Sequence, residues 1–191
     1  MSGGKADAVV IGASAGAVEA LSRILPALPA DYPIPILVVV HIPPDRTDLL
    51  ASLFAAKCAI AVKEAEDKEP IRPGMIYFGP SDYHLQVEAD RSVSLSADEP
   101  VYYSRPSIDV LFESAADAYG PSLIAIVLTG ANQDGAKGLK AVAEAGGTAI
   151  VQSPEGAYAS AMPEAAIAHC PSARVMSLEE IAAYLRDVGK A

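Results

Sequence analysis

The chain has 191 residues, of which 51% are hydrophobic and 20% charged, and its formal net charge is −10 at pH 7. This length and composition suit one globular domain with a sizeable core, and they exclude a disordered chain. The negative charge disfavours nucleic acid and anionic membrane surfaces as partners, because both would repel the protein. No apolar run approaches the roughly 20 residues that span a bilayer, so we expect no membrane insertion.

The N-terminal residues and the cysteines predict the cellular compartment of the protein. Residues 1–5 are too short and too polar for a signal peptide, and we expect a disordered leader there, followed by one domain over 6–191. Cys58 and Cys170 do not make a disulfide framework, and neither belongs to a CxxC motif. We therefore expect reduced thiols and a cytoplasmic protein.

In the first half of the chain, short apolar runs alternate with helical patterns. The predicted strands lie at 7–12, 34–41, 60–65 and 75–80. Helical spacing of apolar residues predicts one helix that ends near Leu25 and another over about 46–57. Alternation of polar and apolar residues across 84–97 predicts a small hairpin.

The second half of the chain continues the same alternation. Helices are predicted at 106–120, 134–145 and 177–188, and strands at 123–130 and 148–152. Apolar strands that alternate with helices are typical of a mainly parallel sheet covered on both faces. The predicted fold class is therefore α/β, a three-layer α/β/α arrangement with a mainly parallel sheet and a small β-hairpin.

Three reactive residues each follow a predicted strand. Ser14 follows the first strand, His41 ends the second, and Asp134 comes shortly after the strand at 123–130. All strands of a parallel sheet point their carboxyl ends at the same edge, so the topology brings these residues together. A nucleophile, a base and an acidic group that orients the base are the set that an acyl-transfer hydrolase requires.

The turn around Ser14 has the pattern Gly-x-Ser-x-Gly. Gly12 and Gly16 lack a β-carbon, so the chain can bend sharply and present Ser14 at the start of a helix. Free backbone N–H groups of Ala15 or Gly16 are candidate donors to an oxyanion. Small residues after a first strand also form phosphate or dinucleotide turns, but neither G-x-G-x-x-G nor GK[ST] is present here.

Each of these residues also has an ordinary explanation. His41 precedes Pro43 and Pro44 and could simply end a strand, whereas Asp134 could be only a helix N-cap. His84 and His169 are interpreted as structural or solvent-facing. We expect no metal site, because the histidines lack ligand spacing.

Arg105 precedes a predicted helix and leaves two interpretations open. It could make a structural ion pair, or it could hold a substrate carboxylate.

Several motifs in order resemble the catalytic domain of CheB-type protein-glutamate methylesterases of bacterial chemotaxis. They are VVIGASAG, ILVVVHIPP, PGMIYFGPSDYHL, SRPSIDVLFESAADAYG, IVLTGANQDGAKGLKAVAEAGG and SAMPEAA. The resemblance covers nearly the whole chain and implies a three-layer fold with no cofactor. It also implies hydrolysis of glutamate γ-methyl esters on chemoreceptor cytoplasmic domains, or on another methylated protein, with deamidation of receptor glutamines as a further activity.

The family's serine, histidine and aspartate fall on Ser14, His41 and Asp134. Many members have a threonine where this chain has Ala15, and many read TGMGxDGA where this chain has TGANQDGA, although Ala131 still offers a backbone N–H. The receiver domain usual in the family is not found in this sequence, so we expect no phosphorylation control within it.

Two other functions remain open at this point. The chain could be a serine esterase or amidase with a different substrate, or a regulatory module of the same fold that has lost catalysis. If His41 is the base, activity is expected to fall below about pH 6–7, where an ordinary histidine gains a proton.

Overall fold

The computed structural model describes residues 5–43 and 49–191. Its main sheet has seven strands in the order β3-β4-β2-β1-β7-β8-β9, and every neighbouring pair is parallel. The strands are β1 (Ala8–Ala13), β2 (Ile36–Val40), β3 (Ala61–Glu64), β4 (Met75–Phe78), β7 (Leu123–Val127), β8 (Thr148–Gln152) and β9 (Arg174–Met176). Because β2 and β7 lie on opposite sides of β1, the chain reverses direction across the sheet there, and such a point is where open α/β sheets bind ligands.

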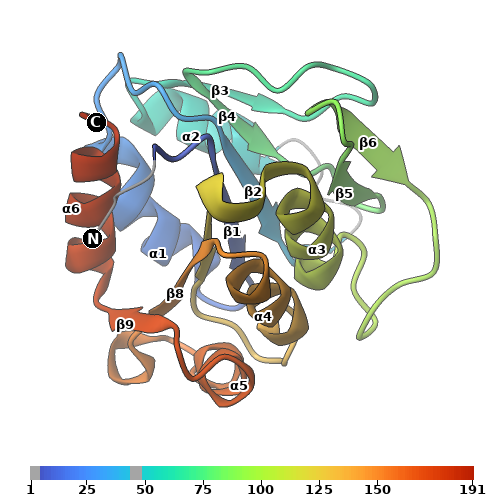
Figure 1. Cartoon of the computed structure of the whole chain (residues 1–191), viewed down its shortest axis with the longest axis vertical. Coiled ribbons are helices and arrows are strands. Elements are labelled where there is room, and N and C mark those ends of the chain that lie inside the picture. The colour runs from blue at the N-terminus through green and yellow to red at the C-terminus, as the bar shows by residue number, and fades with distance from the viewer. Residues whose placement is uncertain (1–4, 44–48) are drawn as a thin grey trace.

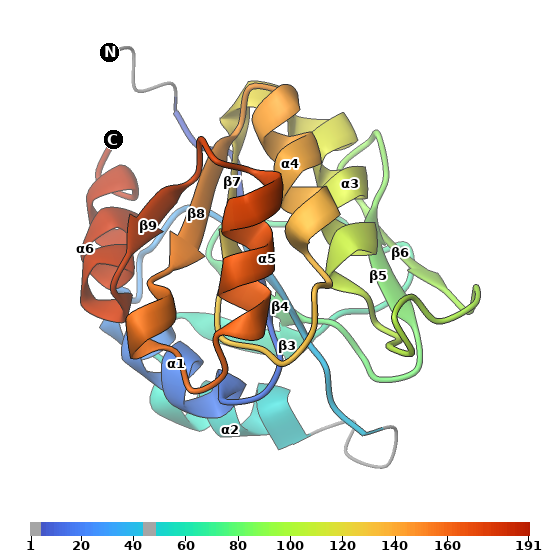
Figure 2. The ribbon, with the colours of Figure 1, turned by 90° about the horizontal axis from the view of Figure 1, so that it is seen from below.

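Helices cover both faces of this sheet (Figure 1). They are α1 (Ala17–Ile24), α2 (Leu49–Lys57), α3 (Ile108–Tyr119), α4 (Ala136–Glu144), α5 (Ala161–His169) and α6 (Leu178–Val188). Helices α1, α2 and α6 pack in one hydrophobic cluster, and α3, α4 and α5 pack in the other (Figure 2). The three-layer α/β/α prediction is therefore confirmed.

The central strands are buried on both sides, which explains their continuous apolar runs. In β1, Val9 and Ile11 face the first cluster, while Ala8 and Val10 face the second. Side chains alternate across a strand, so a strand that must fill two cores has few polar positions. This is why 7–12 and 34–41 could be predicted as buried strands from sequence.

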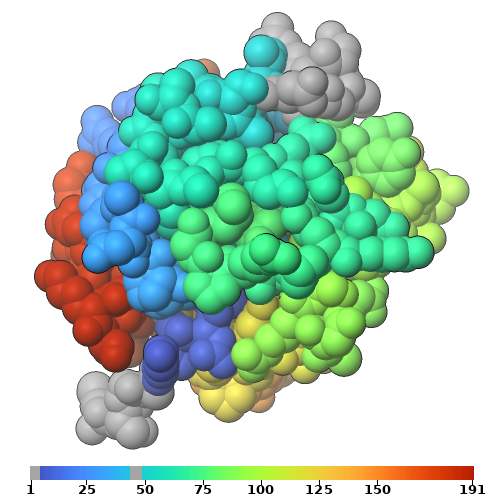
Figure 3. Space-filling model, turned by 90° about the horizontal axis from the view of Figure 1, so that it is seen from above, coloured from blue at the N-terminus to red at the C-terminus, as the bar shows by residue number. Residues whose placement is uncertain are grey.

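The predicted hairpin is present as β5 (His84–Val87) and β6 (Val93–Ser96), which pair antiparallel. Leu85, Val87 and Val93 point into the same hydrophobic cluster as α3. Figure 3 shows the face at the top of Figure 1. The segments around β3, β4 and the hairpin lie side by side on this face, with α6 at one side.

Several predicted boundaries differ from the structure. The helix expected from Pro106 begins at Ile108, because Ser107 is its N-cap. The helix expected from Asp134 begins at Ala136 after Gly135, and the start predicted near 46 lies outside the described residues. Strand β9 was not predicted, since its three residues are partly exposed and show no apolar pattern.

None of the helices in the described ranges has the length and apolar character of a membrane span.

Candidate active site

The three sequence-predicted residues follow three adjacent strands. Backbone hydrogen bonds continue past the strand ends: His41 N donates to Ala13 O at 3.1 Å, and Ser14 N donates to Thr129 O at 2.9 Å. Ser14 is therefore held between the residue after β2 and the residues after β7. The sheet itself sets this placement, because the pairing of Ala13 with Val40 and of Gly12 with Val127 leaves little freedom beyond it.

Asp134 is fully buried, and its carboxylate accepts four hydrogen bonds. Oδ1 accepts from Ser107 Oγ and from Asp109 N, both at 2.9 Å, and Oδ2 accepts from Ile108 N at 2.7 Å. The fourth contact joins Oδ2 to His41 Nε2 at 2.7 Å. Burial tends to raise the pKa of Asp134, but the bonds from His41, Asp109 N and Ile108 N together lower it below the usual value. The group therefore remains a carboxylate.

Asp134 is a helix cap as well as a partner of His41. In the sequence, Asp134 is also a candidate N-cap of the helix that follows it, but the N-cap of α4 is Gly135. Its carboxylate instead accepts the first free N–H groups of α3, which begins 26 residues earlier in the chain. The capping bonds fix both oxygens, so Oδ2 has a defined direction toward His41.

His41 shows only 9% of its side chain to solvent. Since Nε2 is engaged by Asp134, a neutral ring that donates from Nε2 leaves Nδ1 as the basic nitrogen. Within the described residues, the Ser14 hydroxyl makes no hydrogen bond to His41. Such bonds commonly tighten only when substrate is bound.

The turn after Ser14 is sharp. Gly16 has φ of +85°, a left-handed conformation that L side chains rarely adopt, and α1 starts directly after it. The backbone N–H groups of Ala15, Gly16 and Ala131 have no hydrogen-bond partner among the described residues.

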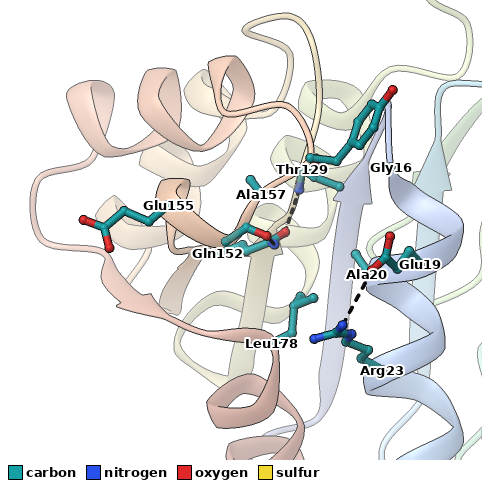
Figure 4. A pocket seen from close by; sticks show the side chains of 11 residues that line it. Gly16, Glu19, Ala20, Arg23, Thr129, Gln152, Glu155, Ala157 and Leu178 are labelled. Carbon is teal, nitrogen blue, oxygen red and sulfur yellow. Dashed lines mark hydrogen bonds and ion pairs between the residues drawn. The ribbon is translucent and has the colours of Figure 1, made fainter.

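Thr129 and Gln152 brace this turn, and neither is among the residues predicted from the sequence. Thr129 Oγ1 donates to Ala15 O at 2.8 Å and accepts from Ala159 N at 2.9 Å. Gln152 Oε1 accepts from Thr129 N at 2.9 Å, and Figure 4 shows this contact beside Gly16. Thr129 is a polar residue two positions after the strand at 123–127, on the same edge as Ser14, and this placement was the signal that could have identified it.

Arg105 is engaged in structural contacts. Its guanidinium donates to Asp82 Oδ1 through Nη2 at 2.7 Å and through Nε at 3.2 Å. Nη1 donates to the carbonyl oxygens of Ala97 and Asp98. Arg105 thus joins the loop before α3 to the end of the hairpin, and the structure favours the ion-pair interpretation over a free cation for a substrate carboxylate.

The other two histidines are structural or solvent-facing, in agreement with the interpretation of the sequence. His84 is buried, with Nδ1 accepting from Ser107 N at 3.1 Å and Nε2 bonded to Glu99 O at 2.9 Å. His169 is exposed near the end of α5. Across the residues that the structure describes, no group of three or more His, Cys, Asp or Glu side chains is placed to hold a metal ion.

Two hollows flank the site. One, of about 350 Å³, is lined by His41, Tyr103 and Arg105 among others. The other, of about 220 Å³, lies beyond Gly16 and contains the Glu19–Arg23 ion pair (Figure 4). Neither hollow could be predicted from the sequence, because the residues that line each one come from segments far apart in the chain.

A parallel sheet that brings a serine, a histidine and a buried aspartate to one edge has the arrangement that serine hydrolases use. Residues 9–185 match the family model of the CheB methylesterase. A relative from Leptospira interrogans, a putative protein-glutamate methylesterase/protein-glutamine glutaminase, is 48% identical over 92% of this chain and 91% of its own length. The chain belongs to the CheB methylesterase family.

Other relatives extend this comparison. The protein-glutamate methylesterase/protein-glutamine glutaminase of Archaeoglobus fulgidus is 40% identical over 83% of this chain, which corresponds to 46% of that protein. The crystal structure of the Thermotoga maritima CheB methylesterase catalytic domain superposes with a TM-score of 0.91 at 36% identity, covering 96% of this chain and 98% of that one. The similarity thus extends over the whole catalytic-domain fold.

Proposed function

We propose that this protein is a protein-glutamate methylesterase that hydrolyses glutamate γ-methyl esters on the cytoplasmic domains of chemoreceptors. The observation that carries the proposal is the buried Asp134–His41 pair, 2.7 Å apart, beside a strand-end serine in a chain of this family. The activity named for the Leptospira interrogans and Archaeoglobus fulgidus relatives supports it. The expected cytoplasmic location belongs to the same proposal, and the free thiols of Cys58 and Cys170 agree with it.

The first half of the reaction transfers the acyl group to the protein. His41 Nδ1 takes the proton of Ser14 Oγ as this oxygen attacks the ester carbonyl carbon. The carbonyl oxygen becomes an oxyanion, and the unbonded N–H groups of Ala15, Gly16 and Ala131 are the donors available to it. The C–O bond to the methoxy group then breaks, and the proton on His41 passes to the departing oxygen to give methanol.

The second half regenerates the serine. Water gives a proton to His41 Nδ1 and attacks the acyl carbon, and the bond to Ser14 Oγ breaks as the oxygen recovers that proton. The released side chain is a glutamate. Asp134 holds the ring of His41 and stabilises its charged form without taking the proton, in agreement with its lowered pKa. These steps use only this chain's own groups and water.

The same groups can deamidate a glutamine side chain. The leaving group is then ammonia, and it must accept the proton from His41 as the C–N bond breaks. The double activity printed in the names of the relatives supports this as a second reaction at the same site.

The experiment that tests the proposal measures methanol released from methylated chemoreceptor membranes. Ser14→Ala is expected to lower the rate by a factor of about 10⁴ or more, because the nucleophile is lost. Ser160→Ala is the matched control, since Ser160 precedes α5 and makes no side-chain capping bond. We expect it to match the wild type. Ammonia released from receptors that carry glutamine tests deamidation in parallel.

A fluorophosphonate that labels serine nucleophiles separates the remaining alternatives. Equal methanol release by wild type and Ser14→Ala would contradict the proposal. Labelling at Ser14 without methanol release would favour an esterase or amidase with another substrate. Absence of both labelling and release would favour a module of this fold without catalysis.

A further inference from the structure

Asp109 is a buried carboxyl group that the mechanism above does not use. It lies in the first turn of α3, and only 4% of the residue is exposed. Its Oδ1 accepts two backbone hydrogen bonds, from Gly135 N at 3.0 Å and from Gly138 N at 2.7 Å. Both donors lie at the start of α4, directly after Asp134. Asp109 therefore caps the helix that follows Asp134.

The two aspartates are arranged reciprocally. Asp134 accepts the N–H groups of Ile108 and Asp109 at the start of α3, and Asp109 accepts those of Gly135 and Gly138 at the start of α4. Each carboxyl group thus satisfies backbone donors of the other helix that would otherwise lack partners. A rotation of the Asp134 side chain breaks the bonds at the start of α3, and a rotation of the Asp109 side chain breaks those at the start of α4.

Close packing leaves these starts little room to move. A β-carbon on Gly138 would lie 2.6 Å from Phe112 Cβ and 3.2 Å from Asp109 Oδ1. Gly135 has φ of +98°, and a β-carbon there would lie 2.9 Å from Ile108 Cγ2. Only glycine permits the approach that brings the N–H groups of both positions onto Asp109.

The pKa values of the two carboxyl groups also differ. Burial raises the pKa of Asp109 against the lowering effect of the Gly138 bond, and the nearby charges of Asp134 and Glu113 raise it further, to about 6. The pKa of Asp134 is lowered, as described above. Asp109 therefore carries the proton more readily, and Asp134 keeps the negative charge beside His41.

We propose that Asp109 is a positioning residue for the reaction: through the start of α4 it holds Asp134 so that Oδ2 stays on His41 Nε2. This proposal rests on the proposed function and adds a residue to its machinery. Asp109 acts through two backbone N–H groups and Asp134, and it does not touch the reacting atoms. What it needs is an acceptor oxygen at Oδ1, not a charge.

Two substitutions separate the acceptor from the charge. Asp109→Asn keeps an oxygen that can accept from Gly135 N and Gly138 N, and we expect kcat within about threefold of the wild type. Asp109→Ala removes the acceptor, and we expect kcat to fall about tenfold to a hundredfold with KM unchanged, since small displacements of catalytic groups have effects of this size. The exposed Asp117→Asn on the same helix is the control and should leave both constants unchanged.

A spectroscopic measurement tests the same point without substrate. The proton in the His41–Asp134 hydrogen bond should give a downfield NMR signal in wild type, Asp109→Asn and Asp117→Asn, and it should be weakened or lost in Asp109→Ala. Because this measurement needs no turnover, it remains informative if the wild type releases no methanol. Failure of the proposed function and failure of the positioning role are thus distinguished.

Three results would overturn the proposal. The first is a folded Asp109→Ala protein with wild-type kcat and an unchanged downfield signal. The second is a folded Asp109→Asn protein that loses tenfold or more in kcat, because the charge would then matter instead of the acceptor. If Asp109→Ala does not fold, Asp109→Leu, which has a similar shape and no acceptor oxygen, takes its place. The third result is that neither of these variants folds while Asp109→Asn folds and behaves as the wild type, which would assign Asp109 to stability alone.

Discussion

Two regions border His41, and they are built differently. One is formed by the ends of β1, β2 and β7, and the other is the loop at 97–106. At the strand ends, backbone pairing places Ser14 and His41, and Asp134 is fully buried with both oxygens bonded. In the loop, Tyr103 is fully exposed and its backbone has φ of +62°. The groups that need fixed geometry therefore come from the sheet, while the loop only borders the hollow beside them.

This difference predicts two kinds of effect. A change at the strand ends should lower kcat, because it disturbs groups that act in the transition state. A change in the loop should alter KM or thermal stability and leave kcat nearly unchanged.

Asp134→Asn should lower kcat by about 10³–10⁴ with little change in KM, because the histidine loses the carboxylate that orients it and stabilises its charged form. In the wild type, backbone N–H groups donate to both oxygens of Asp134. An asparagine replaces one of these oxygens with an NH₂ group, which cannot accept such a bond, so stability should fall as well. Steady-state kinetics of methanol release and thermal melts measure both effects. Glu155→Gln, at the exposed rim of the hollow beside Gly16, is the control. Equal kcat values for Asp134→Asn and this control would show that the strand-end residues are no more important for kcat than exposed residues.

The strand-end residues could be predicted because a parallel sheet brings the residues after its strands together, however far apart they lie in sequence. Asp109 could not be identified in this way. In the sequence it is an ordinary acidic residue in a first helical turn, and its bond to Gly138 spans 29 residues. The same holds for the capping role of Asp134, since the helix that it caps precedes it by 26 residues. Hydrogen bonds between helix starts that lie far apart in the chain leave no periodic pattern.

For the fold, too, repeating patterns could be predicted from the sequence, whereas single positions could not. Long apolar strands and amphipathic helices were predicted because burial repeats along them, and the hairpin at 84–97 was predicted from its alternation. The starts of α3 and α4 were placed two residues early, because Ser107 and Gly135, and not Pro106 and Asp134, occupy the N-cap positions. A cap is a single position, and nearby polar residues compete for it in the sequence.

Gly16→Ala should have the next largest effect. A β-carbon at this position would lie 2.6 Å from Tyr158 Cβ, and φ of +85° is unfavourable for alanine by roughly 1–2 kcal/mol. We expect kcat to fall about tenfold to a hundredfold, since the Ser14 turn must shift. Gly156→Ala is a matched control in the same hollow, because a β-carbon there meets nothing within 4 Å. Equal kinetics for the two variants would show that the turn is not under this constraint.

The pH dependence of stability tests whether the two buried aspartates differ. An ordinary aspartate loses its proton near pH 4 when unfolded, but folded Asp109 keeps it up to about pH 6. The folded protein binds more protons in this range, so the contribution of Asp109 to the free energy of unfolding is lost as pH rises. Asp134, with its lowered pKa, contributes stability above about pH 4 that is lost as pH falls.

Asp109→Asn removes only the first of these terms. Its Tm relative to wild type should therefore rise between pH 4 and pH 7, by roughly 2–4 °C for each 1 kcal/mol. Thermal melts at a series of pH values measure this difference, with Asp117→Asn as the exposed control that should track the wild type. A Tm difference that falls across this range would mean that Asp109 is not the group that holds the proton.

Arg105→Gln should have the smallest effect. It tests the expectation that changes in the loop at 97–106 leave kcat nearly unchanged. Its guanidinium is already bonded to Asp82 and to two carbonyl oxygens, and the Asp82 side chain is 58% exposed. Exposed ion pairs contribute about 0–1 kcal/mol, so we expect Tm to fall by no more than about 4 °C and kcat to stay unchanged. KM should change less than threefold. A larger rise in KM, absent from Asp82→Asn, would show that Arg105 binds substrate despite its structural contacts, and the loop would then share in recognition.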